Sequence, residues 1–214
     1  MYSKEDLLLL SEIPFIDDVT LTLYKDFSES YLLPQKFCYE FLDGSKITVK
    51  FTEWGIYHML AIQHIDGNIK KNQFFAEITN GLSFNDFKVT NRKKKRFADN
   101  KRRISMFSCV YNTLKNGRVF YLPSGNVKNT ANVNVDFIIY DKLKLLTTTE
   151  PAYNGINIGL RQVNNDYIPI TILVSKASDI EEYIINEQAK IVRSLQIFSE
   201  QNELLSEIHY DFIM

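Results

Sequence analysis

The chain has 214 residues, of which 45% are hydrophobic, 13% aromatic and 24% charged, with eight glycines and five prolines. This composition excludes a disordered chain, a collagen and a disulfide scaffold, and the length suits one domain with or without an appendage. No apolar run approaches the roughly 18 residues that a membrane span needs. The two cysteines lack CxxC spacing, so we expect two reduced thiols in a cytoplasmic protein that does not bind membranes.

The formal net charge of −1 conceals a strong segregation of charge along the chain. Residues 1–90 carry a net charge of −5 and residues 129–214 carry −6, whereas residues 91–128 carry +10. Within that middle segment, residues 91–103 contain eight Lys or Arg. Such a field is typical of a protein that binds a polyanion.

The first quarter of the chain predicts helices followed by one β-hairpin. Two runs of alternating apolar side chains, residues 36–41 and 46–51, surround Asp43-Gly44, which is the strongest local signal of a hairpin. Helical patterns precede this hairpin at two places, residues 4–10 and 17–32.

A longer helix is expected directly after the hairpin. Thr52 is a suitable N-cap, and apolar or aromatic residues recur at helical spacing up to Ile65. We therefore predict one continuous helix over residues 52–65. Because His58 and His64 are six positions apart, such a helix points them to different faces, and a metal site formed by this pair is not expected.

The rest of the chain predicts helices, then a sheet, then a final helix. Shorter helical patterns cover residues 72–79, 83–89 and 103–115, and beyond Arg118 the apolar period changes to two. The expected antiparallel strands are residues 119–122, 133–140, 152–160 and 167–174. From Ser178 the apolar residues return to helical spacing.

The predicted C-terminal helix carries a stripe with two interpretations. Ile184, Ile191, Phe198 and Leu205 follow one another at seven-residue steps, which is the spacing of a helical dimer seam. The same stripe over residues 180–205 can instead cover the open face of the sheet. A homodimer through this helix is therefore one of two alternatives.

The sequence carries no motif for a metal or a nucleotide. GxGxxG, the P-loop and HExxH are all absent, so we expect no cofactor and no metal site. The basic segment 91–103 is either a solvated surface loop or an arm that contacts phosphates, in which case binding weakens steeply with salt. In the second interpretation Phe97 stacks on a base. The candidate residues for nucleic-acid contacts are Arg92, Lys93, Lys94, Lys95, Arg96, Lys101 and Arg102.

Three further residues each have a structural and a chemical interpretation. His58 is either a core histidine or a general acid or base, since imidazole titrates near neutral pH. Arg103 either ends the basic segment or binds a phosphate with its guanidinium fork. Thr171 either faces solvent on a late strand or supplies a hydroxyl to a site. Lys128, Tyr153 and Tyr167 are additional candidates that the sequence does not rank.

Several short motifs resemble one known family. Residues 39–65, YEFLDGSKITVKFTEWGIYHMLAIQHI, resemble the phage-associated nuclease-like domains of the barnase–EndoU–colicin–RelE group, and most closely the fourth phage type. The family pattern HLLGL corresponds here to residues 58–62, HMLAI, in which Ala61 replaces the glycine. Residues 103–107, RISMF, are similar to the helix start R-I-x-x-F of that family. Residues 157–160, NIGL, and 167–171, YIPIT, are similar to its closing strands.

This resemblance covers about residues 37–175 and implies both a fold and an activity. It implies metal-independent cleavage of RNA, in which a base removes the ribose 2′-OH proton and the oxygen attacks the adjacent phosphate. By matched positions, His58 is the acid or base, Arg103 holds the phosphate and Thr171 is a site hydroxyl. A second acid–base residue is not identified.

We therefore expect an α+β fold in which N-terminal helices and a β-hairpin precede a mainly antiparallel sheet of the barnase/EndoU/RelE-like type, followed by a long C-terminal helix. The expected segments are an N-terminal helical segment, residues 1–36, a nuclease-like domain, residues 37–175, and a C-terminal helix, residues 176–214.

The expected function is that of a phage- or mobile-element-type ribonuclease, of which a toxin acting on host RNA in the host cytoplasm is one form. An inhibitory or host protein is an expected partner besides RNA. The alternative is a catalytically inactive module that binds nucleic acid, or inhibits host machinery, through residues 92–103.

Overall fold

A computed structural model of the chain describes residues 1–123, 125, 127, 133–146, 152–176, 178–179, 181–184 and 187–210. Within this part of the chain, ten strands form one curled, mixed sheet. The strands are β1 (Glu12–Ile13), β2 (Gln35–Phe41), β3 (Lys46–Lys50), β4 (Arg118–Tyr121), β5 (Phe137–Leu145), β6 (Ala152–Val163), β7 (Asp166–Ser175), β8 (Gln188–Lys190), β9 (Val192–Ser199) and β10 (Leu204–His209).

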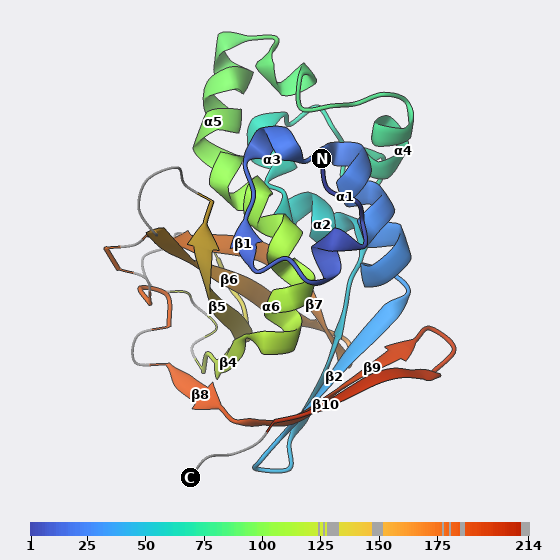
Figure 1. Cartoon of the computed structure of the whole chain (residues 1–214), viewed down its shortest axis with the longest axis vertical. Helices are drawn as coiled ribbons and strands as arrows, with labels where there is room; N and C mark the ends of the chain where they lie inside the picture. Colours follow the sequence, from blue (N-terminus) through green and yellow to red (C-terminus); the bar gives the residue numbers. More distant parts are fainter. Residues whose placement is uncertain are drawn as a thin grey trace.

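The order of the strands shows how the sheet curls. Along its main path the order is β10-β9-β2-β3-β7-β6-β5-β4-β8, and β1 adds to β5. The β3–β7 and β1–β5 pairs are parallel, whereas the other pairs are antiparallel. β8 pairs with β4, and after Ile191 the same stretch of chain continues as β9 beside β2 (Figure 1). This stretch therefore links the β4 side of the sheet to the β2 side, so the sheet must curl.

Short helices cover one face of the curled sheet and extend beyond one end of it (Figure 1). The basic helix α5 lies at that end, far from the β9–β10 hairpin (Figure 1). The helices are η1 (Asp6–Leu8), η2 (Ile16–Asp18), α1 (Leu21–Phe27), η3 (Ser28–Leu32), α2 (Glu53–Met59), α3 (Ile62–Ile65), α4 (Phe74–Thr79), η4 (Asp86–Lys88), α5 (Asn91–Met106), η5 (Phe107–Cys109) and α6 (Val110–Asn116). None of the helices in the described part of the chain is long and apolar enough to cross a membrane.

Side chains on the two faces of the sheet enter two hydrophobic cores. Residues 137–140 of β5 are buried without interruption, although neighbouring side chains of a strand point to opposite faces. Ile139 packs with the helices in the larger core, whereas Ile138 and Tyr140 pack in a smaller core that also contains Phe120. The central strands are therefore covered on both faces.

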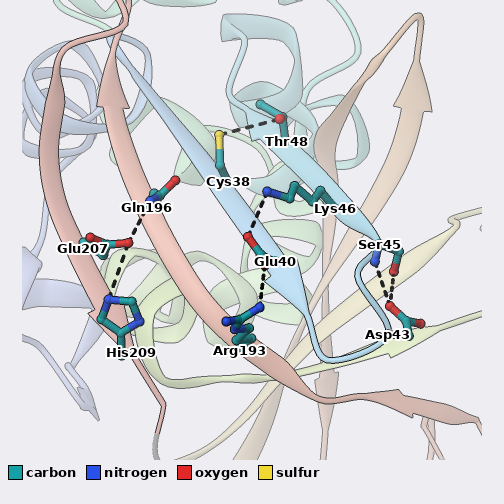
Figure 2. A network of polar contacts seen from close by, with 10 residues as sticks. All are labelled: Cys38, Glu40, Asp43, Ser45, Lys46, Thr48, Arg193, Gln196, Glu207 and His209. Carbon is teal, nitrogen blue, oxygen red and sulfur yellow. Dashed lines mark hydrogen bonds and ion pairs between the residues drawn. The ribbon is translucent and has the colours of Figure 1, made fainter.

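The predicted hairpin is confirmed. β2 and β3 pair in register across Asp43-Gly44, and Gly44 has a φ of 80°, which favours glycine at this turn. On the outer side of this hairpin Glu40 pairs with Lys46 and Arg193, which joins β2, β3 and β9 (Figure 2). Lys46 first, and then Arg193, hold the pKa of Glu40 below its usual range.

The predicted fold is wrong at the C-terminus, where no long helix exists in the described residues. The longest helix is α5 in the middle of the chain, and residues 192–199 and 204–209 form the β9–β10 hairpin. Ile191 lies between β8 and β9, whereas Phe198 and Leu205 lie on two different strands, so the predicted dimer seam is also wrong. Residues 177, 180, 185, 186 and 211–214 of the predicted helix lie outside the described residues. Most strand pairs of the described sheet are antiparallel, as expected, but the parallel β1–β5 and β3–β7 pairs make the sheet mixed, and its ten strands make the fold richer in strands than we expected.

Two other expectations need correction. The segment 52–65 is not one helix, because α2 ends at Met59 and α3 begins at Ile62. The basic residues 92–103 belong to the regular helix α5 and not to a loop. Thr52 caps α2 as expected, since its hydroxyl accepts a hydrogen bond of 3.1 Å from the Gly55 N–H.

Candidate functional site

A cleft of about 440 Å³ lies where α2, α3 and α5 meet β7. The three residues predicted as catalytic, His58, Arg103 and Thr171, all line it. The remaining lining residues are Trp54, Gln63, His64, Val133, Arg161, Ile170 and Leu173. Two imidazoles, two guanidiniums and one hydroxyl thus share one concave site.

Hydrogen bonds from Arg103 link the helices and the strand that form the cleft. Its Nε donates a hydrogen bond of 2.8 Å to the Met59 carbonyl, and its Nη2 donates to the His58 carbonyl and, at 3.1 Å, to Thr171 Oγ1. These carbonyls end α2, where a cation is favoured. The His58 carbonyl also accepts a hydrogen bond of 3.0 Å from the Ala61 N–H. Arg103 therefore caps α2 and ties it to α5 and β7.

The Arg103 guanidinium also keeps some capacity to bind a ligand. In the described part of the chain, its Nη1 has no hydrogen-bond partner. Burial lowers the pKa of Arg103 to about 10, so the group remains positively charged at neutral pH. A fixed cation with a free N–H pair in a cleft is suited to an anionic oxygen.

The break between α2 and α3 brings a second histidine into the cleft. Ala61 has a φ of 58°, in the left-handed region, and it separates the two helices. His64 therefore lines the same cleft as His58, and the prediction that the two point to different faces is wrong. A signal was present, because Ala61 stands where the resembled pattern has glycine, the residue that adopts this conformation most easily.

Both imidazoles lie in surroundings that disfavour a positive charge. Burial is the main cause that lowers the pKa of His58, followed by the charges of Lys71 and Arg103. Partial burial also lowers the pKa of His64, together with Arg103 and Arg96. At neutral pH both rings are thus predominantly neutral and able to accept a proton.

An irregularity in β7 places two neighbouring side chains in the cleft. Gly159 of β6 pairs with Thr171, but Leu160 pairs with Pro169, so Ile170 is the extra residue of a bulge. In a regular strand Ile170 and Thr171 would point to opposite faces, whereas the bulge allows both to line the cleft. The bulge therefore directs the Thr171 hydroxyl towards Arg103.

Gly55 lets α2 approach β7 closely enough to form the cleft. A Cβ at this position would lie 2.6 Å from the Pro169 carbonyl oxygen and 3.1 Å from Thr52 Oγ1. Because the closer atom belongs to the backbone, it cannot move aside without shifting β7. The small residue thus allows α2, which carries His58, to lie close to β7, which carries Thr171.

Gly55→Ala is expected to lower the free energy of unfolding by about 1–2 kcal/mol. Because the added Cβ would lie 2.6 Å from a backbone oxygen, the steric cost falls in the upper part of the range for overpacking, about 2–3 kcal/mol, and the roughly 1 kcal/mol that alanine gains over glycine in a helix offsets part of it. Gly67→Ala is the matched control, since the nearest atom to its added Cβ would be 4.0 Å away. Urea unfolding of both variants measures the difference, and equal stabilities would contradict this account of the helix–strand contact.

The structure divides the predicted nucleic-acid-binding residues into two groups. Arg92, Lys93 and Arg96 line a second cavity beside the cleft. Lys94, Lys95, Lys101 and Arg102 are exposed and line neither cavity. Phe97 is only 1% exposed and packs against Phe84 and Phe87, so the expectation that it stacks on a base is wrong.

Two of the additional candidates, Tyr153 and Tyr167, do not line the cleft. The ring of Tyr153 on β6 makes a cation–π contact with Lys142 of the neighbouring β5, and Tyr167 packs edge-on against Phe137. Lys128 lies outside the described residues. Sequence reasoning missed His64, Gln63, Trp54 and Arg161 as cleft residues.

Comparison with known proteins adds nothing to this geometry. No family model, curated protein or solved structure matches the chain. Among the described residues, no group of three or more His, Cys, Asp or Glu is placed to hold a metal ion. The chemistry of the cleft is therefore the basis for the function.

Proposed function

We propose that the protein is a ribonuclease that cleaves RNA without a metal ion, by attack of a ribose 2′-OH on the adjacent phosphate. The observation that carries this proposal is the convergence of His58, His64, Arg103 and Thr171 on one cleft. Transfer of two protons at a phosphate requires a base, an acid and a group that stabilises negative charge, and these four residues supply each of them.

The proposed reaction uses each group at a stated atom. One imidazole accepts the 2′-OH proton while O2′ forms a bond to phosphorus, and the other protonates O5′ as the P–O5′ bond breaks. The free N–H groups of Arg103 bind the phosphate oxygens as their charge rises. Thr171 Oγ1 already accepts from Arg103, so its own hydrogen is free to donate to the same phosphate. The products end in a 2′,3′-cyclic phosphate and a 5′-OH.

The wider biological role rests on the resemblance alone. The motifs in residues 39–65 and 103–107 are the basis for proposing a phage- or mobile-element-type enzyme that works in the cytoplasm. A toxin of this kind is expected to have an inhibitory protein partner.

The pH dependence of kcat/KM is expected to be bell-shaped, with its maximum below pH 6.5. Catalysis needs one protonated and one neutral imidazole, and both pKa values are lowered from the ordinary 6.5 by burial and by Lys71, Arg103 and Arg96. Above both pKa values the acid is lost, so kcat/KM falls about tenfold per pH unit. A plateau of kcat/KM at pH 8–9 would contradict an imidazole acid.

Incubation of purified protein with end-labelled RNA in EDTA tests the proposal. We expect cleavage with products that carry 2′,3′-cyclic phosphates, and no cleavage by His58→Ala under the same conditions. Products with 3′-OH ends, or cleavage that requires an added divalent cation, would contradict the proposed chemistry.

A second candidate function is a nucleic-acid-binding module without turnover. One observation favours it: Arg103 has a structural task, because it caps α2 and bonds Thr171 whether or not RNA is cleaved. The same assay separates the two, since RNA that stays intact but shifts on a native gel indicates binding alone.

A further inference from the structure

A second cavity of about 270 Å³ lies beside the cleft, between the chain after α3 and the first turns of α5. Its lining residues are Ile65, Asp66, Gly67, Asn68, Thr90, Arg92, Lys93 and Arg96. His64 lines the cleft and its neighbour Ile65 lines this second cavity, so α3 is the wall between them. Arg96 is close enough to His64 to lower the pKa of that imidazole.

The charge of the second cavity is positive and only partly neutralised. Lys93 Nζ lies 2.5 Å from Asp66 Oδ2, so the one carboxylate of the lining is already paired. In the described part of the chain, the guanidinium groups of Arg92 and Arg96 have neither a hydrogen bond nor an ion pair. Two unpaired guanidiniums therefore border a concave space, and each can bind an anionic oxygen bidentately.

One face of α5 borders both the cleft and the second cavity. Arg92, Arg96 and Arg103 are spaced by four and seven residues, which places them within about 40° of one another around a helix. Along the helix axis Arg96 lies about 6 Å from Arg92 and Arg103 about 10 Å from Arg96, at 1.5 Å per residue. This row of guanidiniums leads from the cleft to the second cavity.

We propose that the second cavity is a subsite for a phosphate of the same RNA strand, one that flanks the phosphate cleaved between His58 and His64. This inference rests on the proposed function and deepens it by naming the substrate class: an RNA strand of several nucleotides, and not a dinucleotide or a cyclic mononucleotide. Arg92 and Arg96 bind the flanking phosphate, whereas Lys93 and Asp66, which form an ion pair with each other, line the cavity beside it.

The test compares two substrates and two double variants. One substrate is a dinucleoside monophosphate, which has only the scissile phosphate, and the other is a single-stranded hexaribonucleotide. The variant is Arg92→Gln/Arg96→Gln. The control is Lys46→Gln/Arg193→Gln, which removes the same charge from exposed side chains of β3 and β9 (Figure 2), at the end of the molecule opposite to α5 (Figure 1).

We expect the parent protein to prefer the hexaribonucleotide, and the arginine variant to lower the ratio of the two kcat/KM values at least tenfold. The ratio cancels any effect of Arg96 on the pKa of His64, because that effect is common to both substrates. The control variant is expected to keep the parent ratio. An unchanged ratio in the arginine variant would overturn the subsite.

A binding measurement keeps this inference separate from the proposed function. The probe is a fluorescently labelled hexadeoxyribonucleotide, which lacks the attacking 2′-OH, and its affinity is measured by anisotropy between 50 and roughly 200 mM salt. The arginine variant is expected to bind more weakly and to reduce the slope of log K against log salt by about 0.7, which corresponds to the one flanking phosphate on a single strand. If RNA is not cleaved but this slope falls, the proposed function fails and the subsite stands. An equal slope in both double variants would overturn the subsite whether or not RNA is cleaved.

Discussion

Replacement of His58 by alanine is expected to lower kcat/KM for RNA cleavage by about 10²- to 10⁴-fold, the usual contribution of a positioned acid or base. The loss is chemical and not structural, because the bond from Arg103 goes to the His58 backbone carbonyl, which the variant keeps. The ring makes edge-on contacts with Trp54 and Tyr57, at 5.9 and 5.3 Å between centroids, and is a hydrogen-bond neighbour of the Gln63 side chain. The free energy of unfolding should therefore change by about 1 kcal/mol or less.

Two companion variants make this expectation specific. His64→Ala is expected to cause a loss of similar size, and the double variant a loss smaller than the product of the two, since residues that act as a unit are not additive. His209→Ala is the control, because His209 lies exposed on β10 beside Glu207 (Figure 2), and β10 lies far from α5, which carries Arg103 (Figure 1). A folded His58→Ala protein that keeps kcat/KM within threefold of the parent would remove His58 from the mechanism.

Arg103→Met is expected to lower the free energy of unfolding by about 2–4 kcal/mol, the largest stability effect among the cleft residues. The variant removes three hydrogen bonds and leaves the Met59 carbonyl at the end of α2 without its partner, whereas the His58 carbonyl keeps its bond from the Ala61 N–H. A buried acceptor left unpaired costs about 1–3 kcal/mol, and the flexible Met side chain replaces only the packing of the Arg stem.

The neighbouring arginine provides the matched control for this experiment. Arg102 is exposed on the same turn of α5, so Arg102→Met should change the free energy of unfolding by no more than about 0.5 kcal/mol. Urea unfolding followed by circular dichroism measures both variants. Equal stabilities of Arg103→Met and Arg102→Met would show that Arg103 does not cap α2.

Local signals were sufficient where the structure depends on neighbours in the chain. The hairpin is marked by Asp43-Gly44 between alternating runs, and the central strands β5, β6 and β7 by their period of two. Thr52 was recognised as a cap because its hydroxyl and the Gly55 N–H are three residues apart. Each of these features is decided within a few residues.

The C-terminal region could not be predicted because a distant partner decides its structure. Residues 192–199 combine apolar positions that fit a helix as well as a strand, but they pair with all of β2, more than 150 residues earlier. The left-handed Asn202, with a φ of 65°, marks the turn to β10 and was the local sign against a helix. The apolar spacing predicted a helix, and a single asparagine was too weak a signal to outweigh it.

The candidate site was predicted in part. His58, Arg103 and Thr171, which are far apart in the sequence, do line one cleft, although their chemical roles stay predictions. His64 was missed because the break at Ala61 is a tertiary and backbone feature within an otherwise helical pattern. Phe97 was misjudged because its basic neighbours suggested exposure, whereas the helix turns its ring into the aromatic cluster with Phe84 and Phe87.

The most direct measurement uses a DNA oligomer that contains a single ribonucleotide, incubated with the protein in EDTA. If the cleft of His58, His64, Arg103 and Thr171 acts on a 2′-OH, the strand is cut only after that ribonucleotide and the new end is a 2′,3′-cyclic phosphate. Cutting of an all-deoxy control strand, or a new end with a 3′-OH, would contradict the account.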